Sequence, residues 1–310
     1  MIGQLSFGAD GQIKDKVERS IECLRAFEPP DGYYVAFSGG KDSQCVYHLC
    51  QIAGVKFDAH YAVTSVDPPE LVQFIKSHYP DAWEGRYHAR DKDGKPYTMW
   101  NLIVKHSAPP TRIQRFCCKY LKETGGEMRR TITGVRWAES ANRKISHGQV
   151  TIKNPSKKDT EEINAKGLEY ATDKKHGGII LNYDNDDSRQ VLQTCIRTRK
   201  ILVNPIIDWD ESDVWEFLNS NNIEHCCLYD EGFTRLGCIG CPMGGGKQIE
   251  REFDRWSRYR SMYLTAFGKM LKKRKEKGKE TLWQTPEEVM DWWINGKGVD
   301  DGETLLDDLD

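Results

Sequence analysis

The chain has 310 residues, of which 30% are charged and 38% hydrophobic, and its formal net charge is −2 at pH 7. This balance fits a soluble globular protein and excludes a general electrostatic attraction to nucleic acid or lipid, so any anion site must be local. No apolar run has signal-peptide length at the N-terminus, and none approaches the roughly 20 positions of a membrane helix. We therefore expect a cytoplasmic protein with no membrane partner.

The first predicted elements are a helix, a strand, a second helix and a second strand. Apolar residues recur at helical spacing from Ile13 to Leu24, and a Pro-Pro-Asp-Gly turn at 29–32 ends that helix. The short apolar run 33–37 predicts a buried strand. A helix follows over 45–52, and the stretch 57–64 predicts another strand.

The alternation of strands and helices continues after this unit. We expect a helix near 71–75, a helical stretch over 112–121 and a strand over 131–135. A strand over 201–207 precedes a helix that Asp210 caps. This order predicts an α/β fold with a doubly wound, mostly parallel sheet, in which ligands bind beyond the carboxyl ends of the strands.

Residues 144–190 interrupt the alternation. Eight basic and eight acidic residues lie between Lys144 and Arg189, and periodicity is weak, so we expect a polar insertion, more plausibly a solvated loop than a lid. The predicted organisation is an N-terminal helix (1–30), a Rossmann-like α/β domain with the insertion (31–222), a cysteine loop with C-terminal helices (223–298) and an acidic tail (299–310).

A basic segment lies near the C-terminus. Residues 247–279 contain twelve Lys or Arg and four Asp or Glu, and the apolar spacing from Ile249 predicts one long amphipathic helix. Such a helix could contact nucleic-acid phosphates, with Trp256, Tyr259 and Tyr263 stacking on bases. Aromatic residues at helical spacing are, however, more often part of a core.

The loop after the first strand has the features of an anion site. Gly39 and Gly40 let backbone N–H groups approach an anion, and the following helix directs its positive N-terminal end at the same point. Lys41 adds a positive charge, and the hydroxyls of Ser38 and Ser43 can donate to phosphate oxygens. We expect Asp42 to orient the loop or a Mg²⁺ ion.

The six residues Ser38, Gly39, Gly40, Lys41, Asp42 and Ser43 resemble the PP-loop of the adenine nucleotide α-hydrolases, which include ATP pyrophosphatases and sulfonucleotide reductases. We call this segment the PP-loop. The resemblance implies that it binds ATP or a phosphoadenosine-phosphosulfate-type nucleotide, with Lys41 as a catalytic residue.

A second segment extends the resemblance. Residues 134–143 are similar to the G-x-R-x-x-E-S-x-x-R segment of phosphoadenosine-phosphosulfate reductases. The similarity implies that Arg136 is catalytic and clamps phosphate or sulfate, and that Glu139 and Arg143 belong to the nucleotide site. A surface ion pair between Arg136 and Glu139 is the alternative. Thr64 lies where that family's second strand meets the ribose and adenine.

Ten cysteines in a reducing compartment do not indicate a disulfide framework, so the clustered ones are candidate ligands or reactive thiols. Cys117, Cys118, Cys238 and Cys241 resemble the CC…CxxC set of cluster-bearing sulfonucleotide reductases. Four thiolates match a 4Fe-4S cluster, and zinc is the alternative metal. Cys226 or Cys227 could replace one of the first pair.

One departure from the reductases bears on the reaction. They use a cysteine in a C-terminal Glu-Cys-Gly-x-His segment, and no cysteine follows Cys241 here. The sequence is closer in kind to the iron–sulfur PP-loop proteins of DNA phosphorothioation and tRNA thiolation. That resemblance implies adenylyl activation by ATP and sulfur transfer to a nucleic acid or small acceptor, with a sulfur donor or partner protein.

Two alternatives remain. The first is a sulfonucleotide reductase that produces sulfite, in which Cys195, Cys226 or Cys227 supplies the missing thiolate. The second is a non-catalytic nucleotide-binding subunit or sensor.

Overall fold

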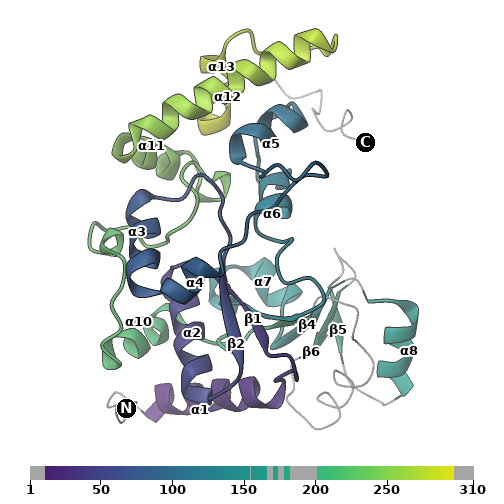
Figure 1. Ribbon diagram of the computed structural model, residues 1–310, viewed down its shortest axis with the longest axis vertical. Coiled ribbons are helices and arrows are strands. Elements are labelled where there is room, and N and C mark those ends of the chain that lie inside the picture. The colour runs from purple at the N-terminus through teal and green to yellow at the C-terminus, as the bar shows by residue number, and fades with distance from the viewer. Residues whose placement is uncertain (1–10, 154, 166–169, 174–177, 182–200, 297–310) are drawn as a thin grey trace. The chain divides into compact units, whose positions relative to one another are not determined.

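The computed structural model describes residues 11–153, 155–165, 170–173, 178–181 and 201–296, and it confirms the α/β fold (Figure 1). The chain forms two compact units. The first contains the chain up to Ala62 together with 69–87 and 125–236, and the second contains 63–68, 88–124 and the chain from Gly237 onward. The linear division expected from the sequence differs from this one, because the second unit combines segments that are remote in sequence.

The first unit is built on a seven-stranded sheet with the order β2-β1-β3-β7-β4-β6-β5. Its parallel part consists of β2 (Phe57–Tyr61), β1 (Tyr33–Phe37), β3 (Arg130–Ile132) and β7 (Ile201–Val203). Tyr33, Val35 and Ile132 are fully buried, as expected for parallel strands that are covered on both faces. The carboxyl ends of β1 and β3 therefore lie at one edge, which is where the sequence predicts the ligand.

The predicted insertion supplies the rest of the sheet. Its strands are β4 (Val150–Ile152), β5 (Ala171–Thr172) and β6 (Ile179–Leu181), and it also contains α8 (Lys157–Ala165). β4 pairs antiparallel with β7 and with β6, and both β4 and β6 are buried along their length. The prediction of a solvated loop is therefore wrong for these strands, because apolar triplets are too short to show a period between charged residues.

Helices surround the sheet of the first unit. They are α1 (Gly11–Ala26), α2 (Lys41–Ala53), α3 (Pro69–His78), α4 (Pro80–Glu84), α7 (Ala141–Ser146), α10 (Glu211–Ser220) and the 3₁₀ turns η1 (Trp137–Glu139) and η2 (Cys227–Tyr229). α1 and α10 both pack against α2. Asp210 is the N-cap of α10, as predicted, and its backbone N–H donates to Asp213 at 2.6 Å.

The second unit is helical. It contains α5 (Met99–His106), α6 (Phe116–Leu121), η3 (Pro242–Gly244), α11 (Gly246–Arg255), α12 (Ser257–Glu276) and α13 (Pro286–Asn295). The single long C-terminal helix predicted from the sequence is wrong, since the backbone breaks at Trp256, where φ is −127° and ψ is 63°. Tyr263, Phe267 and Met270 are fully buried and form the core.

Within the described residues, no helix is both long enough and apolar enough to cross a membrane. Cys195 and the acidic tail from residue 299 lie outside those residues.

Candidate nucleotide site and cysteine cluster

The PP-loop connects β1 to α2 in the first unit. Gly39 has a φ of +74°, and a Cβ built on it would lie 2.7 Å from Ile75 Cγ1 and 2.9 Å from Leu71 Cδ1, both on α3. A side chain at position 39 would therefore be strained by its backbone conformation and would also collide with two core residues. The turn needs glycine at this position.

Hydrogen bonds within the loop fix its shape. Ser43 Oγ donates to Gly40 O at 2.8 Å and accepts from the Ser38 N–H at 3.3 Å. The two serine hydroxyls are 3.2 Å apart. The structure thus places Ser43 as an internal brace of the loop, while Ser38 remains exposed.

The first N–H of α2 is directed at Tyr229. Gly40 is the N-cap and has no side chain with which to cap the helix, and the Lys41 N–H donates to the Tyr229 hydroxyl at 2.9 Å. Burial raises the pKa of the Tyr229 phenol, so it stays neutral at physiological pH. Sequence reasoning missed Tyr229, which lies 188 residues from Lys41.

The ammonium group of Lys41 is buried, with 3% of the residue exposed. Lys41 Nζ donates to Thr234 O at 2.8 Å and lies 3.6 Å from Glu211 Oε1. It also lies 5.6 Å from the centre of the Tyr229 ring. These contacts hold a positive charge beside the PP-loop in a place where little water can screen it.

Arg136 lies next to the same helix end. It is 3% exposed, and its Nε donates to Asp42 Oδ1 at 2.6 Å while its Nη1 donates to Trp209 O at 3.4 Å. The alternative of a surface pair with Glu139 is wrong. Glu139 instead accepts from the Arg136 backbone N–H at 3.0 Å and pairs with Arg143 at 3.2 Å.

Gly134 explains how the segment after β3 reaches the PP-loop. A Cβ at this position would lie 2.9 Å from the backbone carbon of Asp42. Since real Cβ atoms do not approach backbone so closely, only glycine permits this contact. The structure thus brings together Lys41, Asp42 and Arg136, whereas Thr64 belongs to the second unit, where its hydroxyl donates to Asp67 at 2.6 Å.

The four predicted metal ligands all belong to the second unit, and we call them the cysteine cluster: Cys117, Cys118, Cys238 and Cys241. Cys117 and Cys118 lie on α6, and the other two precede η3. A hydrogen bond to Cys118, burial and the charges of the other three thiolates raise the pKa of Cys117. The hydrogen bond from Cys117, joined by one from Arg115 at 3.5 Å, lowers the pKa of Cys118.

The donor chemistry of the cysteine cluster suits a soft metal centre, since it offers four free thiols. In the described part of the chain, no three His, Cys, Asp or Glu side chains stand in an arrangement that could hold a metal ion. Cys226 and Cys227, the alternative ligands, lie at η2 in the first unit.

Comparisons with known proteins assign most of the chain to a family. Residues 32–243 match the family described as the phosphoadenosine phosphosulfate reductase domain. The adenosine 5'-phosphosulfate reductase of Lysinibacillus sphaericus is 19% identical over 202 residues, which are 63% of this chain and 72% of that enzyme. An uncharacterised protein of Methanocaldococcus jannaschii is 26% identical over 214 residues, which are 67% of this chain and only 40% of that protein.

Among solved structures, phosphoadenylyl-sulfate reductase from Candida auris, in a phosphate complex, aligns with a TM-score of 0.40 and 14% identity over 75% of this chain and 97% of that one. The FMN adenylyltransferase of Candida glabrata aligns with a TM-score of 0.41 and 16% identity over 74% of this chain and 62% of that one. The family match covers well over half of the sequence and includes the PP-loop and Arg136. The chain therefore belongs to the phosphoadenosine phosphosulfate reductase domain family.

Proposed function

We propose that this protein binds ATP on the PP-loop and cleaves it between the α- and β-phosphates, so that an acceptor oxygen is adenylylated before sulfur replaces it. The observation that supports this is the pair of buried cations at the start of α2, Lys41 and Arg136, each 3% exposed. Burying two cations at one helix N-terminus is costly. Asp42 and Glu211 offset part of that cost, and a bound polyphosphate would offset more.

Each residue then has a distinct task. The acceptor oxygen attacks the α-phosphorus, the bond to the bridging oxygen of the β-phosphate breaks, and pyrophosphate leaves. Lys41 and the N-terminal N–H groups of α2 stabilise the charge that develops on pyrophosphate, and Arg136 stabilises the α-phosphate. Asp42 is engaged with Arg136 at 2.6 Å and so positions that guanidinium, while Mg²⁺ that accompanies ATP is held chiefly by phosphate oxygens.

The cysteine cluster is proposed to hold a 4Fe-4S cluster, with zinc as the alternative. When bound, such a cluster would supply iron atoms at which sulfur could be held. The acceptor is a nucleic acid or a small molecule, and the sulfur comes from a separate donor or partner protein.

Pyrophosphate release from ATP tests the proposal. Lys41→Met keeps the length of the side chain and removes its charge, and we expect release to fall by about 100-fold or more, the usual effect of losing one preorganised charge-stabilising group. Lys14→Met is the matched control, since Lys14 is exposed on α1. Equal rates in wild type and Lys41→Met would contradict the proposal.

Arg136→Lys separates charge from geometry at the second cation. The substitution keeps a positive charge but loses the planar fork, so it cannot hold Asp42 and a phosphate oxygen together. We expect release to fall with this variant as well.

One observation favours sulfonucleotide reduction as a second candidate. Cys227 is an exposed thiol in the first unit and lies two residues before Tyr229, which contacts the PP-loop. Its thiolate would attack the sulfur of the sulfonucleotide and displace the nucleotide phosphate, and an added dithiol would then release sulfite. Sulfite production by the wild-type protein that is lost in Cys227→Ser would establish this reaction.

Nucleotide binding with release of neither pyrophosphate nor sulfite would leave a nucleotide-binding subunit or sensor.

A further inference from the structure

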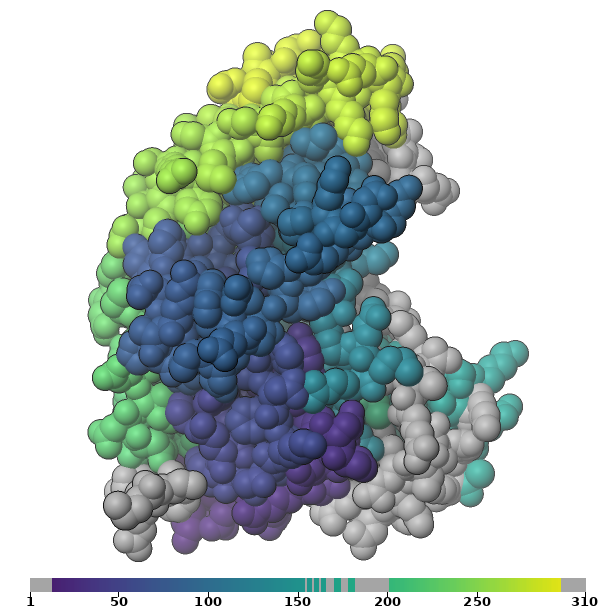
Figure 2. All heavy atoms as spheres, in the orientation of Figure 1, coloured from purple at the N-terminus to yellow at the C-terminus, as the bar shows by residue number. Residues whose placement is uncertain are grey.

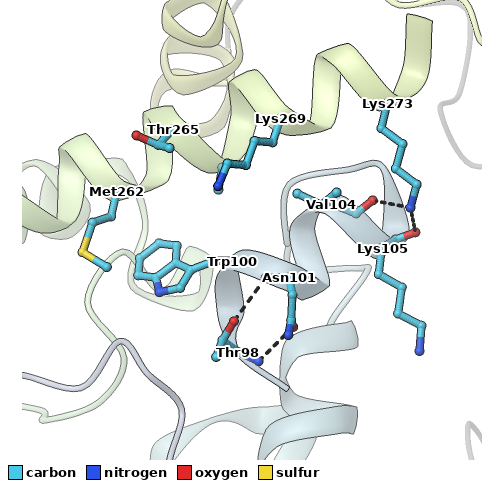
Figure 3. A pocket seen from close by; sticks show the side chains of 10 residues that line it. Thr98, Trp100, Asn101, Val104, Lys105, Met262, Thr265, Lys269 and Lys273 are labelled. Atoms are coloured by element: carbon cyan, nitrogen blue, oxygen red, sulfur yellow. Dashed lines mark hydrogen bonds between the residues drawn. The ribbon is translucent and has the colours of Figure 1, made fainter. Parts of the chain in front are cut away.

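A groove of about 600 Å³ lies between α5 and α12 in the second unit (Figure 3). Ten residues line it, and they include Lys105, Lys269 and Lys273 but no Asp or Glu. In the space-filling view the yellow-green surface of the C-terminal helices adjoins the blue segment that contains α5 (Figure 2). The groove is therefore open, positively charged and free of carboxylates among its lining residues.

The lysines of the groove differ in how they are held. Lys273 Nζ donates to Val104 O at 2.9 Å and to Lys105 O at 3.4 Å, at the C-terminal end of α5. Burial and the charges of Lys277 and Lys105 lower the pKa of Lys273. Lys269 lies one turn earlier on α12, is exposed, and has no carboxylate partner in the described part of the chain.

An aromatic side chain lies in the same groove. Trp100, on α5, is half-buried, and its ring stands edge-on to Tyr263 with a centroid distance of 5.1 Å and an angle of 74°. Figure 3 shows Trp100 directed into the space between the helices, near Met262 and Thr265. Such a ring can stack on a base of a nucleic-acid strand whose phosphates lie along the lysines.

This aromatic residue is not one of those proposed from the sequence. Trp256 and Tyr263 are 8% and 0% exposed, so neither can stack on a base. The Tyr259 hydroxyl donates to Asp67 O at 3.1 Å. The basic segment 247–279 thus contributes charge to the groove, and α5 contributes the aromatic surface.

We propose that this groove binds single-stranded nucleic acid, with phosphates on Lys269 and Lys273 and one base stacked on Trp100. Lys105 takes no part in this contact, because its Nζ donates to the Tyr97 hydroxyl at 2.8 Å and lies 4.5 Å from the centre of the Tyr120 ring. Only an unpaired base can reach a side chain between two helices, so duplex should bind more weakly. As the identification of a sulfur acceptor, the inference rests on the proposed function. As a binding site, it stands on the groove alone.

The binding affinity for a labelled single-stranded oligonucleotide of about 12 nucleotides, measured by fluorescence anisotropy without ATP, tests the site. Two lysines at about 0.7 released counterions each predict a slope of about −1.4 when the logarithm of the binding constant is plotted against the logarithm of the salt concentration. Lys269→Glu should weaken binding by about tenfold or more. Lys272→Glu is the matched control, because Lys272 is exposed on the same helix but does not line the groove, and it should change binding by less than about twofold.

Trp100 provides the second test. Trp100→Leu should weaken binding by about tenfold, and Trp100→Phe should retain most of the affinity because it keeps a stacking face. Circular dichroism establishes that both variants are folded. Equal weakening by Lys269→Glu and Lys272→Glu, or equal competition by duplex, would overturn the inference.

The outcome is separable from that of the proposed function. Pyrophosphate release from wild-type protein, measured with and without the oligonucleotide, tests the PP-loop, and strand binding without ATP tests the groove. Strand binding with no pyrophosphate release in either assay supports the groove and removes adenylylation. Pyrophosphate release without strand binding does the reverse.

Discussion

Gly134 shows how a single residue determines whether the site can form. The close approach of Gly134 to Asp42 leaves no space for a methyl group, although its φ is not in the left-handed region. We expect Gly134→Ala to lower the free energy of unfolding by about 1–3 kcal/mol, the usual cost of overpacking, and to weaken ATP binding.

Urea denaturation and equilibrium binding measure the two effects. Gly237→Ala is the control, since a Cβ at Gly237 would meet nothing within 4 Å. A Gly134→Ala protein as stable as the control would mean that the loop and the segment after β3 are not in close contact.

His48 gives a residue-scale prediction about pH. Burial lowers the pKa of His48 below its usual 6.5, despite an opposing hydrogen bond with Gln51. Below about pH 6.5 the unfolded chain binds a proton that the native state does not, so the free energy of unfolding falls as the pH falls, by at most about 1.4 kcal/mol per pH unit for one group.

His48→Gln removes this titration. We expect the free energy of unfolding of the variant to change less than that of wild type between pH 7.5 and pH 5.5, as measured by urea denaturation. Parallel pH profiles for the two proteins would contradict the prediction.

At the scale of elements, local signals located helices better than they located helix ends. The run of apolar residues from Ile13 predicted α1, and Asp210 predicted the start of α10. The break at Trp256 had no such signal, because apolar spacing continues across it from α11 into α12. The strands β4 and β6 were missed for a related reason, since three residues show no period.

The capping box of α13 allows a test at this scale. Thr285 accepts from the Glu288 N–H at 3.2 Å, and Pro286 follows at the first helical position. Thr285→Ala should cost about 1 kcal/mol in the free energy of unfolding. Ser257→Ala, at the start of α12, is the control because the N-cap there is Trp256. Equal stability of the two variants would show that the cap contributes nothing measurable.

At the scale of the whole molecule, the second unit joins segments far apart in the chain, and the cysteine cluster depends on that joining.

We expect wild-type protein purified without oxygen to contain iron. The Cys238→Ala variant should lose most of this iron, because three thiolates hold a 4Fe-4S cluster less well than four. Cys227→Ala, which changes a thiol outside the cysteine cluster, should retain its iron. Zinc in place of iron would identify the alternative metal, and iron retained by Cys238→Ala would remove Cys238 as a ligand.

The sequence alone determined the family and the position of the PP-loop, because a loop between a strand and a helix is specified by adjacent residues. It also predicted that Arg136, Glu139 and Arg143 belong to the nucleotide site, which stays a prediction. It could not show that Arg136 pairs with Asp42 across 94 positions, or that Tyr229 and Thr234 hold Lys41. Nor could it show that Trp100 shares a groove with lysines of α12. The tertiary structure decided these contacts, because they depend on how remote segments pack rather than on any local pattern.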